Sequence, residues 1–356
     1  MSSYWNGAAT YYRGLIRALA ARGHHTTFYE PDAFERQSHR DLADPSWATV
    51  VVYPGNDEGA AFQQVAAAAR RADVLVKASG VGVYDALLEQ AVLDAARPGQ
   101  STVFWDVDAP ATLGRVWEDA GDPFRRLIPR YDAIFTYGGG QPVVKAYRAL
   151  GARSCVPVYN ALDPDTHHAV APDARYSADL TLLANRLPDR EARVREFFLR
   201  PAERLPARRF LLGGNGWWGE PLPANVRALG HVPTGEHNAL NCSALAVLNV
   251  ARDSMAAVGF SPATRVFEAA GAGACLITDA WEGIELFLEP GEAVLVARDG
   301  DEVVEHLQRL SPERARQIGR AAQRSVLEKH TYARRALQVE ALLCSGSLTG
   351  NVEVSA

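Results

Sequence analysis

The sequence lacks the usual marks of metal-binding, secreted and membrane proteins. Its 356 residues include only four cysteines, which are far apart and form no CxxC pair. A zinc site and a disulfide framework are therefore not expected, and a reducing, cytoplasmic compartment is. No apolar run reaches the length of a membrane span, and Met1 leads straight into polar and aromatic residues rather than a signal peptide. No histidine pair has the i, i+4 spacing of a zinc helix.

The chain also lacks an excess of basic residues. Its net charge is −5 and its pI about 6.0, which argues against a nucleic-acid binder. Apolar residues make up 47% and charged residues 22%, as in an ordinary globular protein. At 356 residues the chain is longer than one hydrophobic core usually supports, so we expect two domains.

Strand-like runs alternate with helix-like ones, which predicts a parallel α/β architecture. In the first half we expect strands at 26–29, 73–77, 101–105, 132–137 and 154–157, and helices at 8–21, 60–71, 84–96 and 143–150. In the second half we expect strands at 179–184, 209–212, 244–250, 274–278 and 293–296, and helices at 190–199, 300–310, 312–328 and 332–343.

The segment 160–178 is rich in Pro, Asp and Ala and has little periodicity, so we interpret it as an interdomain linker. It would join an N-terminal domain (1–159) to a C-terminal domain (179–330), and the last helix and tail (331–356) would cross back to the first domain. We predict two doubly wound, Rossmann-like domains that face one another across a cleft, with ligands at the carboxyl ends of the strands.

The start of the chain is unusual for this architecture, because Ser2–Gly7 already has the composition of a turn. The first strand of a doubly wound domain is usually central. We therefore expect that the first strand is missing, or that the true start differs from Met1. Asn6 and Gly7 precede the first helix and are candidates for binding an acceptor or a sugar phosphate.

The most informative segment is Ser261–Val296. Ser261 is a good N-cap and Pro262 suits the first helical position, and the amides of such a helix suit a phosphate. Arg265 and Glu268 are three residues apart and share a helix face. That face offers a cation for a diphosphate and a carboxylate for a ribose diol. The alternative is that the two residues only form a structural salt bridge.

Asp106 and Asp108 follow the apolar strand at 102–105, at its carboxyl end. One of them is the best candidate for a general base or an acceptor contact. The alternative for Asp108, which precedes Ala-Pro, is a helix cap. The sequence alone does not choose between the two aspartates.

With these residues in view, the chain resembles a GT-B glycosyltransferase of the CgeB-like, spore-maturation type, related to the group 1 glycosyltransferases. The resemblance spans almost the whole length and rests on NGAATYYRGLIRALAARGH, VFWDVDAPATL, the GGG after FTY, YSADLTLLANRLPDR, GHVPTGEHN, LNVARDSM, SPATRVFEAAGAG, LITDAWEGIELFLEPGEAVLV and EKHTYARR.

The resemblance implies an N-terminal acceptor domain, a C-terminal donor domain and a nucleoside-diphosphate sugar as donor, with no metal and no other cofactor. Residue by residue, it places Glu268 on the ribose, Arg265 near the diphosphate and Val232 with its backbone at the base. The remaining donor-site candidates are Ser261, Thr264, Arg190, Arg252, and Trp281 and Gly283 in the loop that abuts the donor sugar.

One departure from the resemblance concerns the sugar. Many retaining GT-B enzymes carry two glutamates in an E-x7-E pattern, and Phe260 takes the first position here. Retention and inversion both stay open. We predict a metal-independent, hexosyltransferase-like enzyme that acts on a small or soluble acceptor. The alternatives are a non-catalytic nucleotide-sugar-binding protein and a GT-B enzyme of other chemistry, such as an epimerase or a pseudoglycosidic coupling enzyme.

Overall fold

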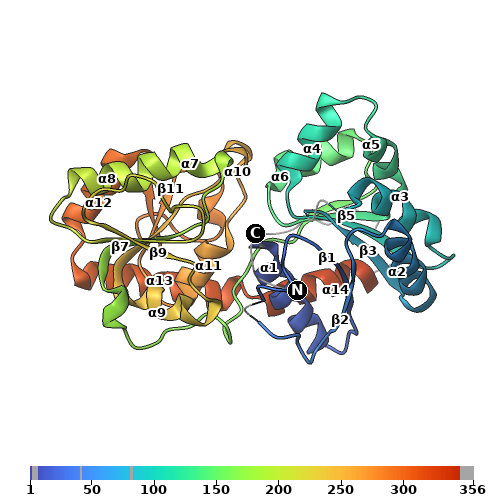
Figure 1. Cartoon of the computed structure of the whole chain (residues 1–356), viewed down its shortest axis with the longest axis horizontal. Helices are drawn as coiled ribbons and strands as arrows, with labels where there is room; N and C mark the ends of the chain where they lie inside the picture. The colour runs from blue at the N-terminus through green and yellow to red at the C-terminus, as the bar shows by residue number, and fades with distance from the viewer. Residues whose placement is uncertain (2–6, 41, 81–82, 345–356) are drawn as a thin grey trace. The chain divides into compact units, whose positions relative to one another are not determined.

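The computed structural model describes residues 1, 7–40, 42–80 and 83–344. Figure 1 shows the chain, which forms two compact units. Unit 1 comprises Met1–Tyr159 and Tyr332–Ala356, and unit 2 comprises Asn160–Thr331. None of the helices within the described residues is both long and apolar enough to cross a bilayer.

Unit 1 is built from parallel strands. β1 pairs with β2, and β3 to β6 pair side by side in chain order. The elements of unit 1 are α1 (Gly7–Ala20), β1 (Thr27–Asp32), β2 (Thr49–Pro54), α2 (Glu58–Arg71), β3 (Val74–Ala78), α3 (Asp85–Ala95), β4 (Ser101–Asp106), α4 (Ala109–Glu118), α5 (Pro123–Leu127), η1 (Ile128–Arg130), β5 (Ala133–Thr136), α6 (Gly140–Ala149), β6 (Cys155–Pro157) and α14 (Tyr332–Cys344).

The last helix of the chain, α14, packs against the first, α1, within unit 1. Gly14 makes this approach possible, because a Cβ at this position would lie 2.2 Å from the ring of Tyr332. On the same helix, the buried Tyr11 hydroxyl donates to the carbonyl of Val158 at 2.7 Å and accepts from the indole of Trp105 at 2.9 Å. These contacts join α1 to α14, to β4 and to the chain after β6.

Unit 2 carries a six-stranded sheet in which all neighbours are parallel. Its elements are η2 (Ala174–Tyr176), β7 (Ala178–Leu183), α7 (Pro188–Val194), the π-helical turn η3 (Arg195–Leu199), α8 (Arg200–Arg204), β8 (Phe210–Gly213), β9 (Val226–Gly230), η4 (Thr234–Glu236), α9 (His237–Ser243), β10 (Ala244–Asn249), α10 (Asp253–Val258), α11 (Thr264–Gly271), β11 (Leu276–Asp279), η5 (Ile284–Leu286), β12 (Leu295–Ala297), α12 (Gly300–Arg309) and α13 (Pro312–Lys329).

The strand order of unit 2 is β12-β11-β10-β7-β8-β9. This is the doubly wound order, in which the chain reverses direction across the sheet between β7 and β10. In Figure 1, α7, α8 and α12 cover one face of this sheet, and α9, α11 and α13 cover the other. Buried side chains such as Leu180, Leu182 and Phe210 form the core. The predicted α/β class with two Rossmann-like, parallel-stranded units is confirmed.

Two strands that the sequence did not predict lie where few neighbours bury them. β9 is the last strand of its sheet, and β2 has a single partner. In β2 only Tyr53 is buried. Strand patterns in sequence reflect a buried face, and β9 buries little. β2, with the sequence TVVVYP, carries a clear strand signal that the prediction overlooked. Helix α4 was also missed; it opens with Ala109 and Pro110 and contains Gly114.

The turn before α11 is held against the loop after β11. Phe260 has a φ of +48°, a left-handed conformation that is rare for a bulky residue, and its backbone N–H donates to the carbonyl of Glu282 at 2.6 Å. Its ring covers Gly283, where a Cβ would lie 2.3 Å from the ring and where φ is +95°. Phe260 and Gly283, two left-handed residues in contact with one another, thus fix this part of the carboxyl edge of the sheet.

We predict that Gly283→Ala destabilises the fold more than Gly291→Ala. Both glycines have a positive φ, +95° and +80°, but no atom lies within 4 Å of a Cβ at Gly291. The backbone conformation costs about 1–2 kcal/mol at either site, and the overlap with Phe260 adds about 1–3 kcal/mol at Gly283 alone. Urea denaturation of the two variants measures the difference. Equal losses of unfolding free energy in the two variants would show that the Phe260 ring moves aside for the added methyl group.

Candidate functional site

The loops that follow β7, β9, β10 and β11 meet at one edge of the unit 2 sheet, because parallel strands end at the same side. The loops after β7 and β10 are bonded to one another. Arg252 Nε donates to Asp189 at 2.8 Å, and the Ser254 hydroxyl donates to the same carboxylate at 2.7 Å. Since β7 and β10 flank the point where the strand order reverses, this is the place where doubly wound proteins bind ligands.

A second carboxylate, that of Asp279, stabilises the same edge of the sheet. Asp279, the last residue of β11, is completely buried and accepts hydrogen bonds from the Arg193 guanidinium at 2.5 Å and from the backbone N–H of Ala251 at 3.0 Å. Burial raises the pKa of Asp279, although Arg193 opposes this. Its contacts are those of a structural residue that ties β11 to α7 and to the loop after β10.

Helix α11 carries the predicted pair of charges in its first turns. Glu268 is buried, with 5% of its surface exposed, and its Oε2 lies 3.2 Å from Nη1 of Arg265. Thr264, the first residue of the helix, also hydrogen-bonds to the Glu268 side chain. Among the described residues, Glu268 Oε2 and Arg265 Nη1 are buried and have no hydrogen bond of good geometry. The pair is therefore close but not fully satisfied.

Two histidines complete this cluster. His167 precedes β7, and its Nε2 lies 4.0 Å from Oε1 of Glu268. His237 is the first residue of α9, stacks on the His167 ring with 6.1 Å between centroids, and contacts the carbonyl oxygen of Val232 through Nε2 at 3.1 Å. We name Arg265, Glu268, His167 and His237 the α11 cluster.

The α11 cluster has a charge pattern set by burial. Burial lowers the pKa of His167, and it lowers the pKa of His237 to about 4, so both rings are neutral at pH 7. Burial also works to raise the pKa of Glu268, but the cations around the carboxylate outweigh it and lower this pKa to about 2. With both histidines neutral, Arg265 is the cation that keeps Glu268 ionised near pH 7.

The ligand atoms of His167, His237 and Glu268 lie within 4.8 Å of one another, a grouping that could hold a metal ion. The guanidinium of Arg265 faces the same carboxylate at 3.2 Å, and a divalent cation would be repelled by it. The arrangement is better suited to a neutral or anionic ligand that offers hydroxyl groups to the carboxylate.

The structure corrects one prediction about this helix. Ser261 is not the N-cap of α11, because the helix begins at Thr264 with Ala263 as the capping residue, and the Ser261 hydroxyl donates to the carbonyl of Gly259 at 2.9 Å. The left-handed Phe260 turns the chain before the helix can start. An anion at this helix end would meet the amides that follow Ala263.

The other unit 2 candidates lie around the same edge. Arg190 is half-buried in the first turn of α7, and Arg252 precedes α10 and pairs with Asp189. Trp281 is buried, and its indole N–H donates to the Thr278 hydroxyl at 3.3 Å. Gly283 is covered by Phe260, so its α-carbon faces a ring rather than open space.

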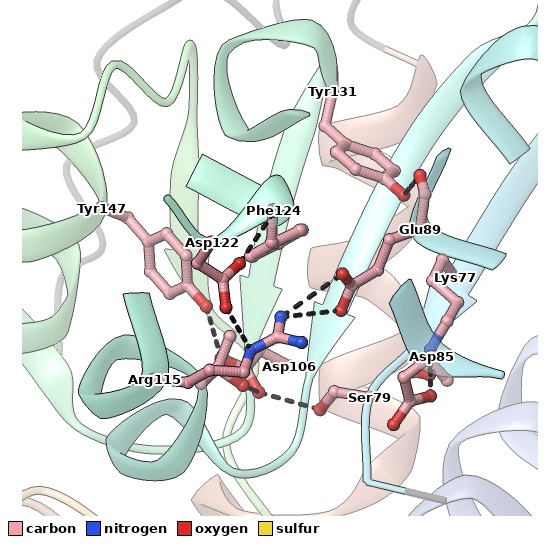
Figure 2. A network of polar contacts seen from close by, with 12 residues as sticks. Lys77, Ser79, Asp85, Glu89, Asp106, Arg115, Asp122, Phe124, Tyr131 and Tyr147 are labelled. Atoms are coloured by element: carbon pink, nitrogen blue, oxygen red, sulfur yellow. Dashed lines mark hydrogen bonds and ion pairs between the residues drawn. The ribbon is translucent and has the colours of Figure 1, made fainter. Parts of the chain in front are cut away.

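In unit 1, the surroundings of Asp106 and Asp108 differ, and Figure 2 shows those of Asp106. Asp106 is completely buried and accepts four hydrogen bonds, from the hydroxyls of Ser79, Thr112 and Tyr147 and from the backbone N–H of Asp108, at 2.5–3.0 Å. Burial raises its pKa despite these donors. A carboxylate with four donors is a structural anchor, so a role for Asp106 as base is not supported.

Asp108 is half-buried at the position before α4, and its side chain makes no capping hydrogen bond to that helix. Asp108 follows β4 by two residues, so it lies near the carboxyl end of a parallel strand and stays the candidate for contact with a ligand. Figure 2 also shows a neighbouring ionic group in which Arg115 lies between Glu89 and Asp122, at 3.0 and 3.1 Å. These contacts join α3, α4 and the start of α5.

The remaining unit 1 candidates, Asn6 and Gly7, lie at the start of the chain. Gly7 begins α1, and Asn6 lies outside the described residues. A hollow of about 680 Å³, which the sequence did not indicate, opens where β1 and β2 end. It is lined by Asp32, Ala33, Val52, Tyr53, Pro54, Gly55 and Asn56. Like the edge of unit 2, it lies at the carboxyl ends of parallel strands.

Comparison with known proteins agrees with this geometry. Residues 190–341 match the family described as "Glycosyl transferase-like", a segment that contains Arg265 and Glu268. No curated protein sequence matches the chain. Many solved structures match its fold.

Three of these structures cover nearly the whole chain. Sucrose-phosphate synthase from Thermosynechococcus elongatus has a TM-score of 0.71 at 15% identity, over 97% of this chain and 94% of its own. Anabaena Alr3699/HepE in complex with UDP-glucose has 0.65 at 13%, over 93% and 94%. The T4 phage BGT in complex with UDP-glucose has 0.60 at 11%, over 93% and 92%. The fold is the GT-B fold of glycosyltransferases.

Sequence reasoning missed part of the α11 cluster. His167 lies in the segment interpreted as a linker, yet that segment belongs to unit 2, where the His167 carbonyl would lie 2.9 Å from a Cβ at Gly271. His237 was only one of several scattered histidines. The GHVP motif before it was the one available signal, because Val232 in that motif supplies the carbonyl that contacts the His237 ring.

We predict that stability falls between pH 6.5 and about pH 4, and that His237→Leu removes part of this fall. The His237 pKa is about 4 when folded and 6.5 when unfolded, so in this range the unfolded chain binds more protons and acid favours unfolding. Urea midpoints at a series of pH values measure the slope. His231→Leu, at an exposed histidine after β9, is the control. An unchanged slope in His237→Leu would contradict the assignment.

Proposed function

We propose that this protein is a glycosyltransferase that takes a sugar from a nucleoside-diphosphate sugar and transfers it to a small or soluble acceptor without a metal ion. The observation that carries the proposal is the buried, ionised Glu268, whose Oε2 has no hydrogen-bond partner among the described residues. It lies beside Arg265 on the helix that follows the switch point of a doubly wound sheet.

The chemistry of this pair matches the two ends of a nucleoside diphosphate. The carboxylate of Glu268 accepts hydrogen bonds from ribose hydroxyls, and such charge-assisted bonds contribute about 1.5–3 kcal/mol each. Arg265 offers a planar fork for phosphate oxygens, and the amides that open α11 favour an anion. Together these groups would stabilise the diphosphate as it leaves the sugar.

The compared structures support the donor class. Anabaena Alr3699/HepE and the T4 phage BGT were each solved with UDP-glucose, so a UDP-hexose is the first donor to test. The resemblance to the CgeB-like proteins narrows the family within this proposal. The hollow at the ends of β1 and β2 is the place in unit 1 that we propose for the acceptor, and Asp108 is the residue that we propose as general base.

Calorimetric titration with UDP, GDP, dTDP and ADP tests the donor site. We expect micromolar binding of one nucleotide, and Glu268→Ala to weaken it about ten- to a hundredfold, because the ribose then loses a charged acceptor. The same affinity is expected in EDTA. Glu313→Ala, at an exposed glutamate of α13 that pairs with Arg316, is the control. Binding of none of the four nucleotides would refute the proposal.

A second pair of variants tests the catalytic assignment. We expect Asp108→Asn to slow nucleotide release from the donor about 10²–10⁴-fold with unchanged nucleotide affinity, because a general base contributes about that much. Asp106→Asn should instead lower the urea midpoint, since the amide cannot accept from four donors. The measurements are a coupled release assay and urea denaturation. Nucleotide binding without any release would favour a non-catalytic binding protein instead.

A further inference from the structure

The α11 cluster contains buried polar atoms that no described residue satisfies. They include Oε2 of Glu268, Nε2 of His167 and Nδ1 of His237. Leaving a buried donor or acceptor without a partner costs about 1–3 kcal/mol, and folded proteins rarely keep several such atoms together. One ring nitrogen of each histidine and one oxygen of Glu268 lie within 4.8 Å of one another, and this gathering indicates a place for groups from outside the protein.

The tautomer of His237 decides what those groups must be. Its Nε2 contacts the carbonyl oxygen of Val232 at 3.1 Å. A carbonyl only accepts hydrogen bonds, so Nε2 carries the proton. In the neutral ring, Nδ1 is then an acceptor. The carboxylate of Glu268 is also an acceptor, so the two side chains cannot bond to one another. Two acceptors side by side require two donors, such as a pair of neighbouring hydroxyl groups.

The spacing of the cluster is wide for a metal ion. Two ligand bonds to zinc join atoms only about 3.4 Å apart. Nε2 of His167 and Oε1 of Glu268 are separated by 4.0 Å, and the three ligand atoms by up to 4.8 Å. Arg265 beside the carboxylate also disfavours a cation.

We propose that His237 Nδ1 and the Glu268 carboxylate together bind the two adjacent hydroxyls of the donor's ribose, so that His237 makes the site select ribonucleotides over deoxyribonucleotides. This inference rests on the proposed function. His167, stacked on the His237 ring, keeps that ring in place. The carbonyl of Val232 sets the tautomer, and Val232 is therefore a positioning residue for the ribose.

The test compares UDP with 2′-deoxy-UDP and 3′-deoxy-UDP in calorimetric titrations. The wild-type protein is expected to bind UDP about tenfold or more tightly than at least one deoxy form. His237→Leu should reduce that ratio about three- to tenfold, the value of one neutral hydrogen bond, by weakening UDP and leaving the deoxy nucleotide unchanged. If another base binds best in the nucleotide panel, its own deoxy forms replace those of UDP.

Two further variants separate recognition from structure. His237→Asn places an amide oxygen near the position of Nδ1 and should restore part of the ratio, and it also serves if His237→Leu fails to fold. His231→Leu, at the exposed histidine after β9, should leave the ratio unchanged.

Three results would overturn the inference. One is an equal loss for UDP and both deoxy forms in His237→Leu, which would mean that the ring only supports the fold or binds a water molecule. Another is an unchanged ratio in all variants. The third is micromolar Zn²⁺ binding that His237→Leu abolishes. If UDP binds and Glu268→Ala weakens it, these results refute the role of His237 alone. If no nucleotide binds, both this inference and the proposed function are refuted.

Discussion

The burial of Glu268 as an anion is the constraint on which the binding edge of unit 2 depends. An ionised carboxylate in an apolar interior costs several kcal/mol after relaxation and needs a compensating cation, which here is the Arg265 guanidinium at 3.2 Å. A purely structural role would be served as well by an apolar pair of similar volume. The cost is understandable if the carboxylate is kept open for a ligand, and its oxygen without a hydrogen-bond partner among the described residues agrees with that.

Two buried aspartates, Asp106 and Asp279, show what a structural carboxylate looks like. Asp106 accepts four hydrogen bonds, and Asp279 accepts from a guanidinium and from backbone and side-chain donors. Burial raises the pKa of both, whereas the pKa of Glu268 is lowered to about 2. Of these three carboxylates, Glu268 has the fewest hydrogen bonds and is the one whose pKa is lowered. This contrast, more than burial itself, is the reason why we propose Glu268 as the ligand-binding group.

The sequence was sufficient where the structure is local or periodic. The alternation of strands and helices predicted the parallel α/β class, because each buried strand carries its own apolar run. The i, i+3 spacing predicted that Arg265 and Glu268 lie on one face, since that follows from helix geometry alone. Prediction from the sequence failed for the cap at Ser261, because the left-handed conformation of Phe260 depends on a contact with Glu282 in another loop. His167 and His237 come from segments 70 residues apart, and no local pattern connects them.

The strained turn at Phe260 links the fold to the site. Its positive φ is unfavourable for an aromatic residue and persists because the ring covers Gly283 and its N–H bonds to Glu282. Strain of this kind is retained where the backbone must take one path for another reason. Here α11 begins only at Thr264, so that Arg265 and Glu268 lie in its first two turns, near its amino end. If the helix began at Ser261, Glu268 would lie almost one turn farther from the amino end of the helix, where an anion is favoured.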